Sequence, residues 1–251
     1  MPVADPLQTV FFDLGFTLLN FEGDFHQVTE ESYLALAESL RKVGCPIQTQ
    51  DFADRFNHAI SEYYRSRDED LIERPIEQYL MQVLESYEFN NLPQEFIQQA
   101  LTNMYRITET HWQLETDALP VLDELQNKGY RMGLISNAAN ADNANRLIDQ
   151  FELRRYFEVI LISAIEKIRK PDARIYSRAM AKMELPPAAA AMVGDTLTAD
   201  ILGAQNAGLR AIWIRRRAQR PENELVIGKI TPDAVIDSLA ELPVVLRAFP
   251  R

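Results

Sequence analysis

The sequence predicts an α/β protein in which a doubly wound parallel sheet carries an inserted bundle of α-helices. Short apolar runs, typical of buried strands, alternate with stretches of helical period, and this alternation favours a parallel sheet with helices on both faces. More than a hundred residues separate the first two runs. One crossover connection needs far fewer residues, so a separate helical unit is expected between them.

Five segments are predicted to be strands, because each is a short apolar run bounded by turn or polar residues. They are Val10–Phe12, Met132–Ile135, Val159–Ile162, Ala191–Val193 and Ala211–Ile214. A helix is predicted from Leu119 to Lys128, since Gly129 can adopt the left-handed conformation that often ends a helix.

The insert is predicted to be helical, because apolar residues recur at helical spacing in four successive stripes. The stripes are Tyr33, Leu36, Ala37, Leu40 and Val43; Phe52, Phe56, Ala59, Ile60 and Tyr63; Ile76, Tyr79, Leu80, Val83 and Leu84; and Phe96, Ile97, Ala100, Leu101, Met104 and Tyr105. Four such helices predict a small bundle over the sheet edge, with its aromatic side chains in the core rather than around a ligand.

Composition and charge narrow the possible partners. The net charge is -11, and residues 21–112 hold 17 acids and 7 bases, so the acidic excess lies in the insert. An acidic chain without a basic face argues against nucleic-acid partners. The exception is Arg215–Arg217 with Arg220. This cluster is expected in a solvated loop, although it could instead lie at the sheet edge and meet an anionic substrate.

The expected location is the cytoplasm. The single cysteine, Cys45, excludes an internal disulfide framework and fits a reducing compartment. No apolar run is long enough to span a bilayer, and the first residues lack the pattern of an export signal, so no membrane partner is expected.

Side chains capable of chemistry follow the ends of the predicted strands. Asp13 follows the first strand, Ser136 and Asn137 follow the second, and Asp195 follows the fourth. In open α/β sheets, ligands bind beyond the carboxyl ends of such strands. Hydroxyl and amide donors suit a phosphate oxygen, and carboxylates suit Mg²⁺. Taken singly, each of these residues could equally serve a turn or a helix cap.

Two further residues extend the pattern. Pro171 restricts Lys170 to extended backbone, which holds this lysine in a loop before a helix that starts near Asp172. Asp200 follows Asp195 by five residues, at the start of a helix rich in small residues.

Together, Asp13, Ser136, Lys170 and Asp195 in this order resemble the haloacid dehalogenase superfamily of phosphatases. The resemblance spans Val10 to about Leu242, and the tail from Pro232 is similar to the last strand and helix of that family. It implies a Rossmann-like catalytic core of residues 1–20 and 113–251. The insert, residues 21–112, looks like the family's helical cap.

The resemblance also implies a mechanism and a cofactor. Asp13 would attack phosphorus and form an aspartyl-phosphate. Mg²⁺ would be held by Asp13, Asp195 and the main-chain carbonyl of Gly15, with Asp200 supporting it through its shell. A carboxylate can approach an anionic phosphate only where cations offset the repulsion.

The substrate implied by the resemblance is a small phosphorylated metabolite, since a cap of this size would bar phosphoproteins. Ser136 and Lys170 would hold the phosphate oxygens, and Thr17 and Asn137 would also bind the substrate.

The sequence departs from the family pattern at position 15. Phosphatases of this family usually have an Asp there, which protonates the leaving group and then activates water, whereas Gly15 has only its main-chain carbonyl. Loss of a general acid/base typically costs about 10² to 10⁴ in rate, and least when the leaving group needs no proton. Phe16 stands where the family commonly has Gly, and it adds bulk beside the gap.

Four functions follow from this departure. The first is a phosphatase that is slow or acts on activated leaving groups, with Asp24, His26 or His111 as a substitute acid. The second is a phosphonatase, which needs a cap lysine, and Lys42 is the one lysine of the insert. The third is a metal-independent haloacid dehalogenase, and the fourth is a non-catalytic protein that binds a phosphate ligand. The first is favoured: the acids at 195 and 200 look like the metal-dependent branch and argue against the dehalogenase, and Lys42 is expected at a helix end. Gly15 favours the non-catalytic protein, but retention of Asp13, Ser136, Lys170 and Asp195 argues against it.

Overall fold

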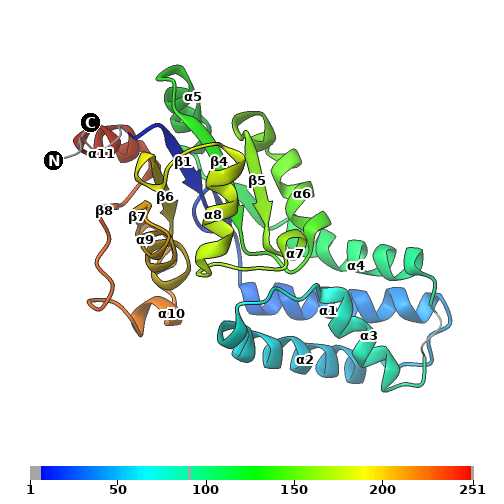
Figure 1. The fold of residues 1–251 in the computed structure, drawn as a ribbon. Coiled ribbons are helices and arrows are strands. Elements are labelled where there is room, and N and C mark those ends of the chain that lie inside the picture. The colour runs from blue at the N-terminus through cyan, green and yellow to red at the C-terminus, as the bar shows by residue number, and fades with distance from the viewer. Residues whose placement is uncertain (1–6, 90–91, 250–251) are drawn as a thin grey trace.

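The computed structural model describes residues 7–89 and 92–249, and its centre is a six-stranded parallel sheet (Figure 1). The strands are β1 (Thr9–Phe12), β4 (Arg131–Ser136), β5 (Val159–Ile162), β6 (Ala190–Gly194), β7 (Arg210–Ile214) and β8 (Ala234–Ile236). Their order is β5-β4-β1-β6-β7-β8, and every neighbouring pair is parallel. The predicted fold class is confirmed, and each of the five predicted strands is present.

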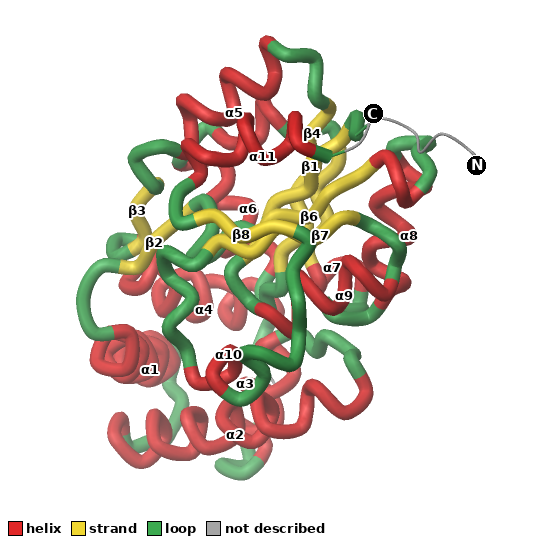
Figure 2. The backbone as a smooth tube through the Cα atoms, turned by 90° about the vertical axis from the view of Figure 1, so that its left-hand side faces the viewer, coloured by secondary structure: helices red, strands yellow, loops and turns green. Residues whose placement is uncertain are grey.

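Helices cover both faces of the sheet, because successive strand residues point to opposite sides. Phe12 belongs to an apolar cluster with residues of α5 (Ala118–Asn127), α6 (Ala141–Gln150) and α11 (Leu242–Ala248). Phe11 belongs to a second cluster with residues of α8 (Ala173–Lys182) and α9 (Gly203–Asn206). Figure 2 shows α5 and α11 above the strands and α8 and α9 on the other side. The shorter helical turns are η1 (Leu153–Tyr156), α7 (Ser163–Glu166), η2 (Pro187–Ala189), η3 (Leu197–Leu202), α10 (Pro221–Glu224) and η4 (Leu239–Glu241).

Helices α1 to α4, which lie between β2 (Leu19–Phe21) and β3 (Trp112–Leu114), form what we call the helical insert. They are α1 (Phe25–Lys42), α2 (Thr49–Asp70), α3 (Ile76–Glu85) and α4 (Gln94–Glu109), and they pack around their own apolar cluster. Two residues that the stripes placed in this core are exposed, namely Val43 at 37% and Phe96 at 40%. Both lie at helix ends, where the neighbouring helices no longer cover them.

A short antiparallel ribbon joins the insert to the sheet. It consists of β2 (Leu19–Phe21) and β3 (Trp112–Leu114), with Phe21 opposite Trp112 and their ring centroids 5.2 Å apart. The sequence analysis does not predict these strands, since each is only three residues long. The ribbon crosses both predicted domain boundaries, so the division into residues 1–20 with 113–251 and residues 21–112 stays a prediction.

The insert also meets the sheet domain through a polar junction around Glu73, which lies between α2 and α3 and is 2% exposed. Its carboxylate accepts hydrogen bonds from the hydroxyls of Tyr63 (2.5 Å) and Ser163 (2.9 Å), and Arg169 Nε lies 3.5 Å from it. Arg169 also donates to Asp68 of α2 at 2.7 Å. The insert therefore holds the loop that carries the lysine predicted to bind phosphate.

None of the helices within residues 7–89 and 92–249 combines the length and the apolar character needed to cross a membrane.

Candidate active site

The structure places the candidate residues at one edge of the sheet. Asp13 directly follows β1, Ser136 is the last residue of β4, and Asp195 directly follows β6. Because β4 and β6 both run parallel to β1 as its neighbours, their carboxyl ends meet. The main-chain N–H of Asp13 donates to the carbonyl of Val193 at 3.0 Å, which continues the strand pairing up to the site.

Lys170 connects two of the carboxylates. Its Nζ donates to Oδ1 of Asp13 and to Oδ1 of Asp200, both at 2.6 Å, and the residue is 2% exposed. Burial alone would lower the pKa of Lys170, but the two carboxylates outweigh it and raise that pKa. Burial raises the pKa of Asp13 to about 6, against the opposing effect of Lys170. The lysine therefore remains charged and partly offsets the negative charge around Asp13.

Asp195 is 1% exposed, as is Asp200. Burial, together with the charges of Asp200 and Asp13, raises its pKa to about 8, although Arg220 acts in the opposite direction. The indole N–H of Trp213 and the side-chain amide of Asn223 donate to its main-chain carbonyl at 2.8 and 2.9 Å. These bonds fix the backbone that carries the carboxylate.

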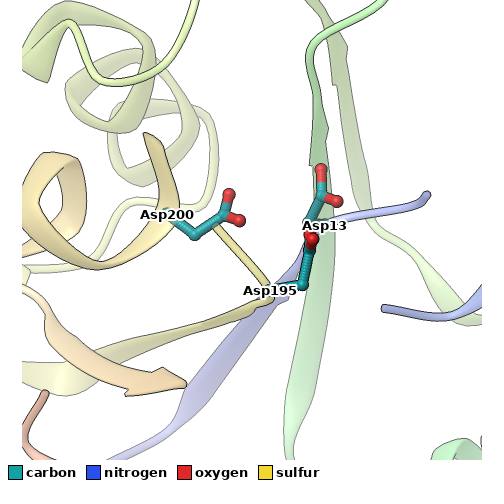
Figure 3. Close-up of side chains that lie close together, drawn as sticks. All are labelled: Asp13, Asp195 and Asp200. Atoms are coloured by element: carbon teal, nitrogen blue, oxygen red, sulfur yellow. The ribbon is translucent and has the colours of Figure 1, made fainter. Parts of the chain in front are cut away.

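Asp200 reaches the site from η3, and Figure 3 shows it pointing toward Asp13 and Asp195. The approach depends on Gly194, because a Cβ atom there would lie only 2.3 Å from Cγ of Asp200. The main-chain N–H of Thr196 donates to Oδ2 of Asp200 at 3.0 Å and orients the carboxylate. Gly194 therefore has a packing reason that the sequence alone does not reveal.

The three acids suit a divalent cation. One carboxylate oxygen each from Asp13, Asp195 and Asp200 can lie within 4.8 Å of one another. Oxygen donors are what Mg²⁺ prefers, and Lys170 alone does not neutralise three buried carboxylates. The donor set fits the ion implied by the resemblance, while the residue-by-residue assignment, including the carbonyl of Gly15, stays a prediction.

The three predicted phosphate-binding or substrate-binding polar residues differ in their surroundings. Ser136 is buried at the end of β4, and its donation to a phosphate oxygen stays a prediction. The side-chain amide of Asn137 instead bonds to the main chain of Lys170. Its Nδ2 donates to the carbonyl of Lys170 at 3.0 Å, and its Oδ1 accepts from the N–H of Lys170 at 2.9 Å. Its amide is thus engaged in positioning the lysine rather than open to substrate. Thr17 is fully buried, and its hydroxyl has no hydrogen-bond partner within the described part of the chain.

The space beside Gly15 is occupied by a side chain of the β2–β3 ribbon, that of Trp112. A Cβ atom on Gly15 would lie 3.3 Å from the ring of Trp112, so the indole takes the space beside the missing carboxylate. Phe16 adopts a φ of 60°, and its ring packs edge-on against Trp112 with centroids 5.2 Å apart. Left-handed backbone favours Gly, which is the residue that the family commonly has at this position. Trp112 was not among the candidate residues, because nothing in its local sequence links it to Gly15.

The arginine cluster is only partly the solvated loop that the sequence analysis expected, since Arg215 and Arg217 are exposed whereas Arg216 and Arg220 are half-buried. Arg216 pairs with Asp117 at 2.8 Å, and Arg217 pairs with the buried Glu115 at 2.8 Å. Arg220 reaches Asp195 at 3.2 Å. Ion pairs with acids thus hold the loop after β7 in place. Its last arginine, Arg220, lies at the candidate site, in agreement with the alternative expectation that the cluster lies at the sheet edge.

Two of the three proposed substitute acids, Asp24 and His111, make structural contacts. Asp24 caps α1 by accepting from the N–H groups of His26 (2.9 Å) and Gln27 (3.1 Å), and His26 itself is exposed. His111 stacks on Phe21, and its Nδ1 contacts the carbonyl of Glu22 at 2.7 Å. None of these contacts supports a role in proton transfer.

The phosphonatase hypothesis gains nothing from the structure. It requires Lys42 in the site, but Lys42 is the exposed last residue of α1.

Stability in EDTA should fall as the pH rises from about 4 to about 8. The pKa of Asp13 is raised to about 6 and that of Asp195 to about 8, both from 3.8, so the folded chain binds protons that the unfolded chain has released. Deprotonation in this range therefore disfavours folding. The check is the midpoint of thermal unfolding as a function of pH, with Asp195→Asn expected to flatten the upper part of the curve. If the dependence of the unfolding midpoint on pH is the same in Asp195→Asn as in the wild type, the raised pKa is not that of Asp195.

Comparison with known proteins agrees with this geometry. The chain is 33% identical over 125 residues to a glyceraldehyde 3-phosphate phosphatase of Methanothermobacter thermautotrophicus, covering 50% of this chain and 55% of that protein. It is 25% identical over 209 residues to the enzyme of the same name from Pyrococcus furiosus, covering 83% and 81%. The chain thus spans about half of the first relative and most of the second.

A solved structure covers nearly the whole chain, and a family model covers more than half of it. The structure of a 2-haloacid dehalogenase from Pseudomonas syringae pv. Tomato superposes with a TM-score of 0.67 at 27% identity, covering 96% of this chain and 98% of that one. Residues 48–214 match the family model of haloacid dehalogenase-like hydrolases. The chain therefore belongs to the haloacid dehalogenase-like hydrolase family, as the order of its strand-end residues predicts.

Proposed function

We propose that this hydrolase is a Mg²⁺-dependent phosphatase of a small phosphorylated metabolite, with Asp13 as its nucleophile. The observation that carries the proposal is the bridge from Lys170 to Asp13 and Asp200, beside Asp195, at the carboxyl edge of the sheet. The relatives that are named phosphatases also support phosphate hydrolysis. The cytoplasm remains the proposed location, supported by the single buried cysteine, Cys45.

The proposed reaction has two steps. A carboxylate oxygen of Asp13 attacks phosphorus, the bond to the leaving oxygen breaks, and an aspartyl-phosphate forms. Water then attacks this phosphorus and releases inorganic phosphate and free Asp13. Lys170 and the Ser136 hydroxyl would hold the phosphate oxygens. A divalent cation held by Asp13, Asp195 and Asp200 would supply further charge neutralisation.

We also propose that the helical insert acts as a cap over this edge. The buried junction at Glu73 supports a closed arrangement, because it ties the insert to Arg169, the neighbour of Lys170. A closed cap would exclude water and restrict the substrate to small molecules.

The packing of Trp112 on Gly15 supports a leaving group that departs without a proton. No carboxylic acid stands at position 15 to protonate a departing alkoxide, and the indole occupies the adjacent space. Leaving groups that depart without a proton are least affected by this loss. The proposed substrates are therefore acyl phosphates and other phosphate compounds with acidic leaving groups.

The test compares phosphate release from acetyl phosphate and from glycerol 3-phosphate, each with Mg²⁺. The wild type should prefer acetyl phosphate by about 10² or more in kcat/KM. Gly15→Asp alone should gain little on glycerol 3-phosphate, since its Cβ atom would lie 3.3 Å from the Trp112 ring. Gly15→Asp combined with Trp112→Ala should gain more. Trp112→Ala alone is the control for loosening of the ribbon.

Equal rates on the two substrates would refute the missing-acid interpretation. Release of no phosphate from either substrate, with Mg²⁺ bound, would favour the protein that binds a phosphate ligand without turning it over.

A second candidate is hydrolysis of a carbon–halogen bond, favoured by the similarity to the 2-haloacid dehalogenase along nearly the whole chain. In that reaction Asp13 would displace halide from carbon, and water would hydrolyse the resulting ester. Halide release from 2-chloropropionate in EDTA would establish it, and its absence beside metal-dependent phosphate release would exclude it.

A further inference from the structure

Arg220 makes a direct contact with one of the three candidate metal ligands. Its Nη1 lies 3.2 Å from Oδ2 of Asp195, whose side chain is 1% exposed. Within residues 7–89 and 92–249, Arg220 is the one Lys, Arg or His whose nitrogen lies within ion-pair distance of Asp195. The guanidinium thus supplies the positive charge that this carboxylate otherwise lacks.

The side chain of Arg220 is held in this place from two sides. Its guanidinium carbon lies 4.5 Å from the centre of the Phe16 ring, within the range of a cation–π contact. Its Nε lies 2.9 Å from Oε1 of Glu222, within ion-pair distance. Phe16 is the residue with a φ of 60°, so the bulky side chain at that strained position is the one beneath the arginine.

The three acids of the site pair with two different cations of the protein. Lys170 bonds to Asp13 and Asp200, and Arg220 bonds to Asp195. A divalent cation bound by the three acids would need the negative charge that Arg220 now partly neutralises. It would also repel the guanidinium, because both are positive and both contact the same carboxylate.

From this arrangement we infer that Arg220 competes with Mg²⁺ for Asp195 and lowers the affinity of the site for the ion. The inference rests on the proposed function, since it takes Asp195 as a metal ligand. Phe16 strengthens the competition by holding the guanidinium against the acid. The protein's own two cations thereby offset part of the negative charge of the three acids until the ion enters.

The experiment is a calorimetric titration of the full chain with Mg²⁺ at constant ionic strength. Arg220→Gln should bind the ion about tenfold more tightly than the wild type, the change expected when a close charge of the same sign is removed. Arg220→Lys retains the charge and should bind nearly as the wild type does. Phe16→Gly relieves the backbone at φ 60° and removes the ring, so it should tighten binding by a smaller factor.

Arg217→Gln is the matched control, because it removes the same charge from the same loop while its partner is Glu115. Its affinity should stay within about twofold of the wild type, since surface charges at a distance are screened. If Arg220→Gln binds Mg²⁺ no more tightly than Arg217→Gln, the competition is refuted and the proposed function stands. If none of the proteins binds Mg²⁺, the proposed metal-dependent function fails together with the inference.

Discussion

A protein carrying Asp13→Asn should release phosphate from acetyl phosphate at least about 10³-fold more slowly than the wild type. The carboxamide is neutral and a far weaker nucleophile than the carboxylate, yet it has nearly the same size. Because Asp13 is only 9% exposed and Lys170 can still donate to the amide oxygen, the fold should be retained. The measurement is kcat with Mg²⁺, together with acid-quench trapping of phosphate on the chain from labelled substrate.

The matched control is Asp237→Asn, an acid with 65% of its side chain exposed and paired with Arg215 at 2.8 Å. It should keep wild-type turnover and incorporate label. Turnover of Asp13→Asn within tenfold of the wild type, or label on its chain, would assign the nucleophile to another residue.

Lys170→Met should destabilise the protein by about 3–5 kcal/mol and abolish turnover, because it leaves two buried carboxylates without their shared cation. Its Nζ bonds to both Asp13 and Asp200 at 2.6 Å, and its side chain is 1% exposed. Methionine fills a similar volume, so loss of charge rather than a cavity dominates. The free energy of unfolding is measured by urea denaturation in EDTA.

The double variant Lys170→Met with Asp200→Asn distinguishes the electrostatic cause from simple packing. Removing one of the two carboxylates should reduce the cost of removing the lysine. An equal cost in both backgrounds would show that Lys170 acts through packing alone. Lys182→Met, at an exposed position near the end of α8, should leave stability unchanged.

The location of the site residues at the strand ends was predictable, because it depends on short segments of the sequence. Buried parallel strands are short apolar runs, and the residue that follows each run must lie at the ligand-binding edge. Asp13, Ser136 and Asp195 could therefore be placed near one another without coordinates, and the structure brings them to one edge. The helical insert was predictable for the same reason, since its period of hydrophobicity is local.

The surroundings of the site were not predictable, because they depend on contacts between distant segments. Trp112 comes from the far end of the insert to fill the space at Gly15, and the three-residue strands that bring it there have no detectable pattern. Asn223 fixes the backbone of Asp195 from a turn 28 residues away. Arg220 could be singled out as part of a basic cluster, but its partner could not.

The polar junction at Glu73 has a thermodynamic consequence. The apolar cluster of the insert is separate from the two clusters of the sheet, and Ala139 is the residue of the sheet domain that packs against it. Lifting the insert would therefore hydrate a carboxylate and a guanidinium while exposing little new hydrocarbon. The heat-capacity change of unfolding follows exposed apolar area. Opening of the insert would then change the heat capacity little, and its cost would lie in separating the buried carboxylate from the guanidinium.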